Sequence, residues 1–204
     1  MRKYNFSFPV LIHRFEKHDL IRNELLKLIN EQDHDELIGG DDNIISLDWI
    51  RSTDNNRTWV KLIREDLEQH LLEMVSTLGC SSIHINELWY QQYSNQGTHG
   101  WHKHGSNYTG VYYVDLTDDC ARTRLSNSSN PHIHTDVIAQ EGDILIFPST
   151  LTHRALVQSI DYTKTIISFN FDFDYFPEEY ITTIDNSVGV DFETYRDIRG
   201  IYRK

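Results

Sequence analysis

The chain has 204 residues, of which 39% are hydrophobic and 12% aromatic, with only 10 Gly and 4 Pro. This composition excludes a disordered, collagen-like or low-complexity chain and predicts one globular domain with its own core. The net charge of −12 disfavours binding to duplex nucleic acid or to an anionic membrane. No apolar run approaches the roughly 18 to 20 residues of a membrane span, and the first residues lack a secretory cleavage pattern, so we expect a cytoplasmic protein.

Two amphipathic helices are predicted in the N-terminal part of the chain. Apolar residues recur at helical spacing over 16–30 and again over 58–78, where Gly79 follows as a stop signal. The polar stretch 31–43 between them is rich in carboxylates but lacks the spacing of a calcium loop. We interpret it as a solvated surface loop.

Short segments rich in Ile, Val, Tyr and Phe follow Gly79 and are separated by turn residues. They predict strands over 83–93, 109–116, 137–140, 143–147, 154–159 and 163–173. Their number and spacing favour an antiparallel sandwich or barrel, with the two helices covering one face. We therefore predict a mainly β protein with N-terminal helices, formed as a single domain over 1–204. Its parts are a helical region over about 1–79, a β core over about 83–173 and a C-terminal extension over 174–204.

Histidine is unusually frequent, with 11 residues, and several of them cluster around the start of the second predicted strand. His102 and His104 lie two residues apart, so in an extended chain their side chains project to the same side. Such a pair can hold one metal ion between its members. A third ligand must come from elsewhere in the fold, and His153 follows an apolar strand that begins with the turn at Gly142 and ends at Pro148.

The order of these motifs resembles the iron(II)- and 2-oxoglutarate-dependent oxygenases. The motifs are His-x-His at 102–104, Gly-Val-Tyr-Tyr-Val at 110–114, Gly-Asp-Ile-Leu-Ile-Phe-Pro at 142–148, His153, and Lys164 ahead of Ser-Phe-Asn at 168–170. The match covers roughly 87–172 and is most similar to a branch found in marine bacteria and their phages, distantly akin to prolyl hydroxylases. The resemblance implies a double-stranded β-helix, which is a jelly-roll of eight strands like that of the cupins.

The resemblance also implies an enzyme with iron(II) as cofactor and 2-oxoglutarate as co-substrate. Such an enzyme hydroxylates a C–H bond of a peptide or small molecule with O2 and releases succinate and CO2. The implied catalytic residues are the metal ligands His102, His104 and His153. Lys164 stands where the family places the cation that pairs with the distal carboxylate of 2-oxoglutarate. A lysine inside an apolar strand calls for such an anion, because a buried cation is costly when unpaired.

Five further residues are expected at the pocket. Strand alternation suggests that three of them point inward and contact the co-substrate, namely Tyr112, Ser168 and Asn170. The two that would shape the pocket wall are Trp101 and Tyr90.

One position departs from the wider superfamily, in which two histidines and one carboxylate hold the metal. His104 occupies the position of that carboxylate, so the iron would carry one more positive charge than usual. Three other ligand sets therefore stay open: one that uses His99, one that recruits a carboxylate such as Asp115, and a two-histidine site with an open position.

The remaining polar residues have weaker functional interpretations. His132 and His134 lie next to Asn and Pro in a predicted loop, which favours a surface position or the mouth of the active site. Arg154 is an exposed or pairing residue, or it meets an acidic group of the substrate at the same mouth. Cys80 and Cys120 are predicted to be free thiols.

Two other functions stay open on the sequence. The segment 142–153 and the His-x-His pair also resemble cupin motifs, so a three-histidine metal dioxygenase that does not use 2-oxoglutarate is the runner-up. Cupins, however, place a Glu a few residues after the His pair, and 107–109 are Asn, Tyr and Thr. The other alternative is a non-catalytic jelly-roll binding protein. The expected partners are a peptide or small-molecule substrate and O2, with neither duplex nucleic acid nor a membrane, and a homodimer is allowed.

Overall fold

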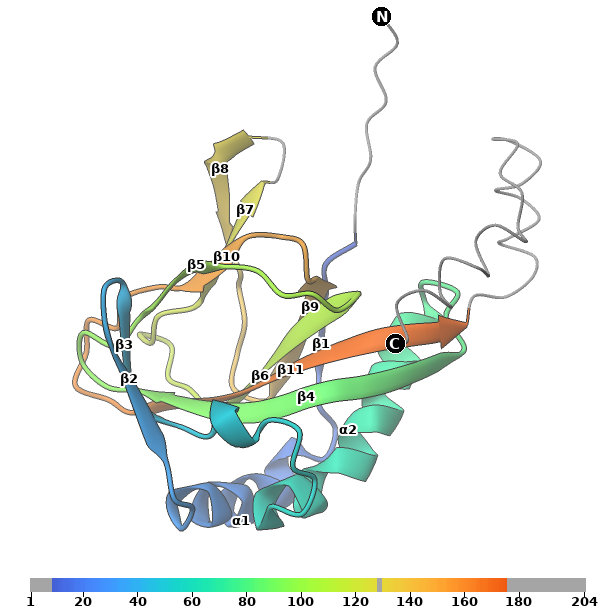
Figure 1. Cartoon of the computed structure of the whole chain (residues 1–204), viewed down its shortest axis with the longest axis horizontal. Helices are drawn as coiled ribbons and strands as arrows, with labels where there is room; N and C mark the ends of the chain where they lie inside the picture. The colour runs from blue at the N-terminus through green and yellow to red at the C-terminus, as the bar shows by residue number, and fades with distance from the viewer. Residues whose placement is uncertain (1–8, 128–129, 176–204) are drawn as a thin grey trace, which may run out of the picture.

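The structure is a computed structural model that describes residues 9–127 and 130–175 (Figure 1). Residues 1–8 and the part of the predicted C-terminal extension from 176 onward lie outside the described residues. The N-terminal elements are β1 (Leu11–Arg14), α1 (His18–Asn30), β2 (Asp35–Gly39), β3 (Asp42–Leu47), the short 3-10 helix η1 (Trp49–Arg51) and α2 (Thr58–Ser76). The remaining strands are β4 (Ser82–Tyr93), β5 (His99–His102), β6 (Tyr108–Asp115), β7 (Thr123–Asn127), β8 (Asn130–Asp136), β9 (Asp143–Pro148), β10 (His153–Ala155) and β11 (Lys164–Tyr175).

The strands form two antiparallel sheets. The larger sheet has the order β1-β9-β6-β11-β4-β3-β2, and the smaller one has the order β5-β10-β7-β8. A cluster of buried side chains from both sheets lies between them, including Val111, Leu125, Leu145 and Ile166. The prediction of a mainly β protein with antiparallel sheets and two helices is therefore confirmed.

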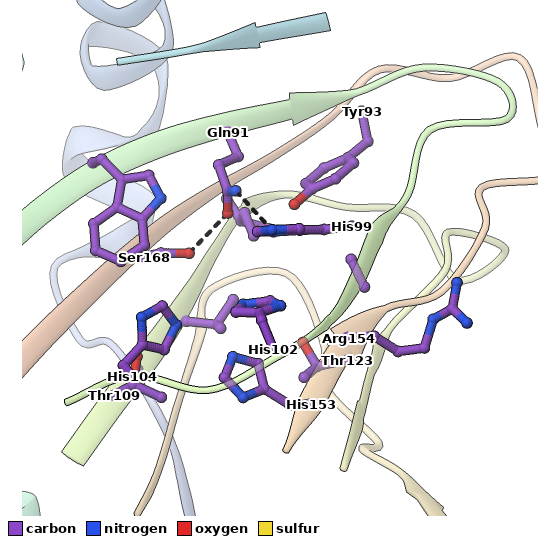
Figure 2. A pocket seen from close by; sticks show the side chains of 15 residues that line it. Gln91, Tyr93, His99, His102, His104, Thr109, Thr123, His153, Arg154 and Ser168 are labelled. Atoms are coloured by element: carbon purple, nitrogen blue, oxygen red, sulfur yellow. Dashed lines mark hydrogen bonds between the residues drawn. The ribbon is translucent and has the colours of Figure 1, made fainter. Parts of the chain in front are cut away.

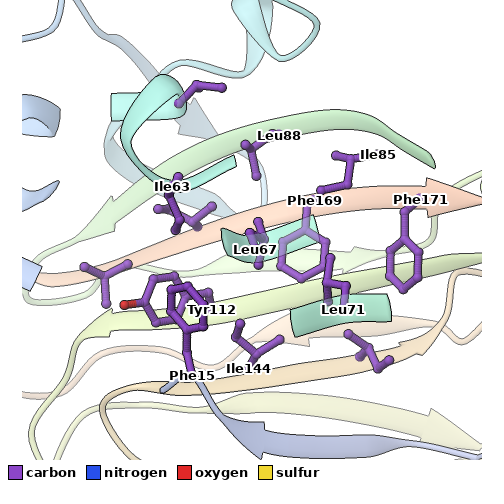
Figure 3. Close-up of a cluster of buried hydrophobic side chains, with 14 of the residues drawn as sticks. Phe15, Ile63, Leu67, Leu71, Ile85, Leu88, Tyr112, Ile144, Phe169 and Phe171 are labelled. Carbon is purple, nitrogen blue, oxygen red and sulfur yellow. The ribbon is translucent and has the colours of Figure 1, made fainter. Parts of the chain in front are cut away.

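Both helices pack on the outer face of the larger sheet (Figures 1 and 3). Helix α1 buries Leu25 and Ile29, and α2 buries a longer apolar stripe that includes Ile63, Leu67 and Leu71. These side chains share one cluster with residues that point outward from β4, β6, β9 and β11. Both faces of the larger sheet are thus covered, one by the helices and the other by the smaller sheet.

Strand β11 shows how this arrangement separates core from site. Ile167, Phe169 and Phe171 face the helices, as Figure 3 shows for the two phenylalanines. The alternate residues Lys164, Ile166, Ser168 and Asn170 therefore face the smaller sheet, because successive side chains of a strand point to opposite faces. A polar row thus lies in the interior of the β core.

Gly110 in β6 has no room for a side chain, because the ring of Phe169 lies over it. A Cβ at this position would come within 2.2 Å of two ring carbons of Phe169. We expect Gly110→Ala to lower the free energy of unfolding by about 1 to 3 kcal/mol, the usual cost of overpacking a core. Urea denaturation measures this. Gly105→Ala is the control, since its added Cβ would meet nothing within 4 Å; equal stability of the two variants would contradict the packing.

The acidic stretch 31–43 differs from its interpretation as a surface loop. It contains most of a hairpin, in which β2 pairs with β3 at the far edge of the larger sheet. The turn consists of Gly40 and Asp41, and Gly39 at the end of β2 and Gly40 have φ of +146° and +58°, values that glycine adopts readily. The Gly-Gly pair was the hairpin signal in the sequence. The strands escaped prediction because an exposed edge strand does not need an apolar face.

Three smaller predictions in the β core are corrected. The stretch 137–140 is not a strand, and the strand in this region, β8, lies just before it and carries His132 and His134, which were placed in a loop. Strand β10 begins one residue before the predicted 154–159 segment and covers only its first two residues, Arg154 and Ala155.

Among the described residues, no helix is long and apolar enough to cross a membrane.

Candidate metal centre

Strand pairing brings the three predicted histidines together at one end of the smaller sheet (Figure 2). His102 is the last residue of β5, His153 is the first of β10, and the two are direct cross-strand partners. His104 follows after one residue, and its backbone N–H donates to the carbonyl of Ser149 at 3.0 Å. His102 thus stands at the end of one strand, His153 at the start of another, and His104 in a loop that is tied to Ser149 by a backbone hydrogen bond.

The three side chains converge on one point. Their candidate ligand nitrogens all lie within 4.8 Å of one another. The ring centroids of His102 and His153 are 4.2 Å apart, and His104 lies 5.1 Å from the first and 5.2 Å from the second. Within the described residues, this is the one group of three or more His, Cys, Asp or Glu side chains with such geometry.

Two of the histidines are oriented by the backbone. The Nδ1 atom of His102 lies 2.8 Å from the carbonyl of Gly100, and that of His153 lies 2.9 Å from the carbonyl of Leu151. A carbonyl oxygen only accepts, so each Nδ1 carries the proton and Nε2 is free to bind a metal. Metal-binding histidines typically have such a partner on the second ring nitrogen.

Burial keeps the three imidazoles neutral, which is the form that binds metals. Desolvation, together with the neighbouring histidines, lowers the pKa of His153 to about 3 and that of His104 to about 4. Desolvation also lowers the pKa of His102. Converging neutral nitrogens of this kind suit zinc, copper, iron or nickel, whereas magnesium and calcium prefer oxygen ligands. The residues present therefore fit a transition-metal ion such as iron(II).

The histidines face a pocket whose floor is the inner face of the larger sheet. On this face the side chains form three rows, each crossing β4, β11 and β6 in that order. The rows are Glu87–Asn170–Thr109, Trp89–Ser168–Val111 and Gln91–Ile166–Tyr113. The cavity beside the histidines has a volume of about 30 Å³, which is room for about two water molecules. This volume is far below the roughly 300 to 1,000 Å³ of a typical small-molecule pocket.

Lys164 lies at the far end of the same floor, opposite Tyr93 of β4. Its side chain is 2% exposed, and its ammonium group donates to the carbonyl of Ala121 at 2.7 Å and lies 4.7 Å from the centre of the Tyr93 ring. Burial lowers its pKa to about 8. Among the described residues no carboxylate pairs with it, and the nearby cation of Arg122 adds to the effect of burial in lowering its pKa.

The three predicted co-substrate contacts have different outcomes. Ser168 lines the pocket and donates to Gln91 Oε1 at 3.0 Å. Asn170 points into the same interior but is held by side chains around His104. Tyr112 lies on the opposite face, where its hydroxyl is 2.7 Å from Nδ1 of His18 in α1, so its inward placement is corrected.

Neither of the two predicted wall residues is among those that line the cavity beside the histidines. Tyr90 packs in the helix-covered core, and its hydroxyl lies 3.3 Å from the Ser46 hydroxyl, so it does not form the wall. Trp101 is 39% exposed and stacks on His134 with ring centroids 5.1 Å apart. The Arg154 guanidinium lies 5.6 Å from the centre of the Trp101 ring.

The alternative ligands can be placed as well. His99 lines the pocket and stacks on His102 at 4.0 Å, but it does not belong to the converging group. Asp115 accepts from Arg22 and from the Tyr162 hydroxyl and does not line the pocket. Cys80 and Cys120 are free and buried.

Several polar residues at the site were missed on the sequence. They are Gln91, Tyr93 and Thr123, which line the pocket, and Glu87, which contacts Asn170. Alternation along 83–93 groups the first two with Glu87 on one face, but both faces of this strand carry apolar residues. The sequence pattern therefore did not show which face was internal.

No protein-family model matches the sequence, and no curated protein matches it. Solved structures with a similar fold include a 2-oxoglutarate-iron(II) oxygenase-family oxidoreductase from Burkholderia pseudomallei, with 12% identity and a TM-score of 0.62 over 79% of this chain and 84% of that one. A Pseudomonas putida prolyl-4-hydroxylase has 13% identity and a TM-score of 0.58 over 80% and 93%. A Trichoplax adhaerens prolyl hydroxylase, in complex with a hypoxia-inducible-factor peptide fragment, has 14% identity and a TM-score of 0.58 over 81% and 83%. The chain thus has the fold of the 2-oxoglutarate-iron(II) oxygenases.

Proposed function

We propose that this protein is an iron(II)- and 2-oxoglutarate-dependent oxygenase built on a double-stranded β-helix. The observation that carries the proposal is the convergence of His102, His104 and His153 within 4.8 Å, in a pocket where His153 is buried and the other two are partly buried. The likeness of the fold to oxygenases of this kind supports it. The finer resemblance to a branch of marine bacteria and their phages stays a prediction.

In this proposal the three histidines hold the iron, and Lys164 pairs with the distal carboxylate of 2-oxoglutarate. Bound iron(II) and 2-oxoglutarate supply the oxidation of a substrate C–H bond by O2, with release of succinate and CO2. The chain contributes the ligands, the cation and an interior that excludes water, which strengthens each charge interaction inside it. Ser168 and Gln91 offer polar groups along the pocket floor.

The substrate proposed is a peptide or a small molecule. One structural neighbour holds a peptide fragment, which supports the first option. The acidic chain, at −12, continues to disfavour duplex nucleic acid. The mouth residues Trp101, His134 and Arg154 lie together and would meet a substrate first.

Lys164→Met tests the co-substrate part of the proposal. It removes the cation and keeps the apolar stem, so we expect 2-oxoglutarate to bind about 30-fold more weakly or worse, since breaking a buried charge pair costs about 2 to 5 kcal/mol. Iron(II) affinity should not change. The measurement is an anaerobic titration of the iron(II) protein with 2-oxoglutarate, followed by the visible charge-transfer band of the chelated co-substrate.

Lys61→Ala, an exposed substitution on α2, serves as the matched control. Equal 2-oxoglutarate affinity in Lys164→Met and the native chain would remove Lys164 from the site. If the native chain binds iron(II) but gives no charge-transfer band on addition of 2-oxoglutarate, a cupin-like three-histidine dioxygenase would be favoured. Absence of iron binding would favour a jelly-roll binding protein.

The same titration should depend on pH in a defined direction. The pKa of Lys164 is lowered to about 8 by burial, so the free protein loses this positive charge as the pH rises through that value. The affinity for 2-oxoglutarate should therefore be highest below pH 8 and fall above it. Bound carboxylate raises the pKa of the ammonium, so the complex keeps its charge to higher pH.

A further inference from the structure

The acidic stretch 31–43, which has no part in the proposed function, reaches the metal centre at its end. The first two residues of β3, Asp42 and Asn43, meet the segment that leads into β5 and its histidines. Asn43 and Thr98 exchange two backbone hydrogen bonds, one of 2.8 Å from Asn43 N–H to the Thr98 carbonyl and one of 3.0 Å in the reverse direction. Backbone pairing thus joins the β2–β3 hairpin to the start of β5.

Asp42 adds a side-chain contact two residues further along. Its Oδ1 atom accepts a hydrogen bond from the backbone N–H of Gly100 at 2.8 Å. A Cβ on Gly100 would lie 2.9 Å from the Cβ of Asp41, which is closer than carbon atoms pack. The turn of the hairpin therefore packs directly on the backbone of Gly100.

Gly100 in turn orients His102. The Gly100 carbonyl accepts from Nδ1–H of His102 at 2.8 Å, which leaves Nε2 of this ring for the metal. The same Asp42 Oδ1 atom also lies 3.7 Å from Nε2 of His99, whose ring stacks on that of His102 with centroids 4.0 Å apart (Figure 2). One carboxylate oxygen thus lies beside both groups that support His102, the backbone of Gly100 and the ring of His99.

We propose that Asp42 is a positioning residue of the metal centre: it holds Gly100, and through the Gly100 carbonyl it fixes the direction in which His102 presents Nε2. Asp42 does not belong to the converging group of ligands. The inference rests on the proposed function, and it gives the acidic hairpin a role in the site. The Asp42 side chain is 29% exposed, so water screens its charge and the hydrogen bond to Gly100 carries the effect.

Asp42→Ala in the full chain tests this, with Co(II) as the probe. The visible absorption of Co(II) reports both its dissociation constant and its coordination, independently of any activity. The variant removes the acceptor of Gly100 N–H and keeps the backbone pairing of Asn43 with Thr98. We expect Co(II) to bind about 10-fold more weakly, as is usual when a partner that orients a metal ligand is lost. The bands at saturating Co(II) should also differ from native, because His102 is no longer held in one direction.

Asp41→Ala is the matched control. It removes the neighbouring carboxylate from an exposed position of the same turn, with the same change in net charge, and keeps the Cβ that packs on Gly100. Its Co(II) affinity and bands should be native.

Asp42→Asn is the conservative variant that separates the hydrogen bond from the charge. Its side-chain oxygen still accepts from Gly100 N–H, so we expect Co(II) affinity to return to within about threefold of native. Near-ultraviolet circular dichroism establishes that each variant is folded.

The outcomes distinguish this inference from the proposed function. If the native chain binds no Co(II), or if His153→Ala binds it as the native chain does, the metal centre itself is wrong. If His153→Ala loses binding while Asp42→Ala keeps native affinity, the centre stands and the role of Asp42 is overturned. Weaker binding by Asp42→Ala with native bands at saturation would also overturn it, since Asp42 would then support the fold and not the direction of His102. If Asp42→Asn binds as weakly as Asp42→Ala, the hydrogen-bond argument is wrong.

Discussion

His153→Ala is expected to weaken iron(II) binding by more than about 100-fold, a larger effect than the 10- to 100-fold usual for residues one step away from a metal. His153 is 5% exposed and is the cross-strand partner of His102, and its Nδ1–H donates a hydrogen bond to the Leu151 carbonyl. Its loss leaves two ligands and a gap that alanine does not fill. An anaerobic titration of the metal-free protein with iron(II) measures the effect.

His132→Ala is the matched control, because it removes an exposed histidine of β8. It should leave the iron(II) titration unchanged. His104→Ala should also reduce iron affinity, which tests the one ligand that departs from the usual two-histidine, one-carboxylate set. A native titration curve for His153→Ala would exclude it as a ligand, and one for His104→Ala would favour a two-histidine site.

The largest effect on stability is expected at Asp48, which lies outside the metal centre. Asp48 is fully buried and accepts hydrogen bonds from the Arg57 guanidinium, from Trp59 Nε1 at 3.0 Å and from the backbone N–H of Tyr90 at 2.9 Å. It connects the start of α2 to β4. Asp48→Ala leaves Arg57 buried without its counter-ion, which typically costs about 3 to 5 kcal/mol.

Urea denaturation of Asp48→Ala should show this loss as a lower midpoint with an unchanged slope. Asp161→Ala, at an exposed turn position, should change the free energy of unfolding by less than about 0.5 kcal/mol. A loss below 1 kcal/mol in Asp48→Ala would contradict this prediction and would mean that the carbonyls of Asp54, Ser52 and Leu88, which also accept from the Arg57 guanidinium, hold it without a counter-ion.

Much of the site was predictable because its signals are local. Two histidines at i and i+2 project to one side of any extended segment, and the third follows a long apolar strand. A lysine in an apolar strand indicates a buried cation in the same way. The structure brings the three histidines together, and it buries Lys164 on the face of β11 that looks toward the smaller sheet, although Lys164 is not among the residues that line the pocket beside the histidines.

The local sequence pattern could not show to which face of the sheet the Tyr112 side chain points. Strand β6 is buried along almost its whole length, so neither set of alternating residues is marked as internal. The helices cover the outer face, which makes it as apolar as the inner one. Glu87 was missed for a related reason, because a glutamate in a strand is normally taken as solvent-facing.

The sequence by itself determined the ligand types, their order along the chain and the periodicity of the helices and the main strands. These properties depend on residues close together in the chain, where spacing alone places side chains relative to one another. Only the tertiary structure decided which sheet face the helices cover, that the acidic stretch 31–43 pairs at a sheet edge, and that Asn170 contacts both Glu87 and His104. These features depend on the register between distant strands, and many registers satisfy the same local pattern until the whole core is packed.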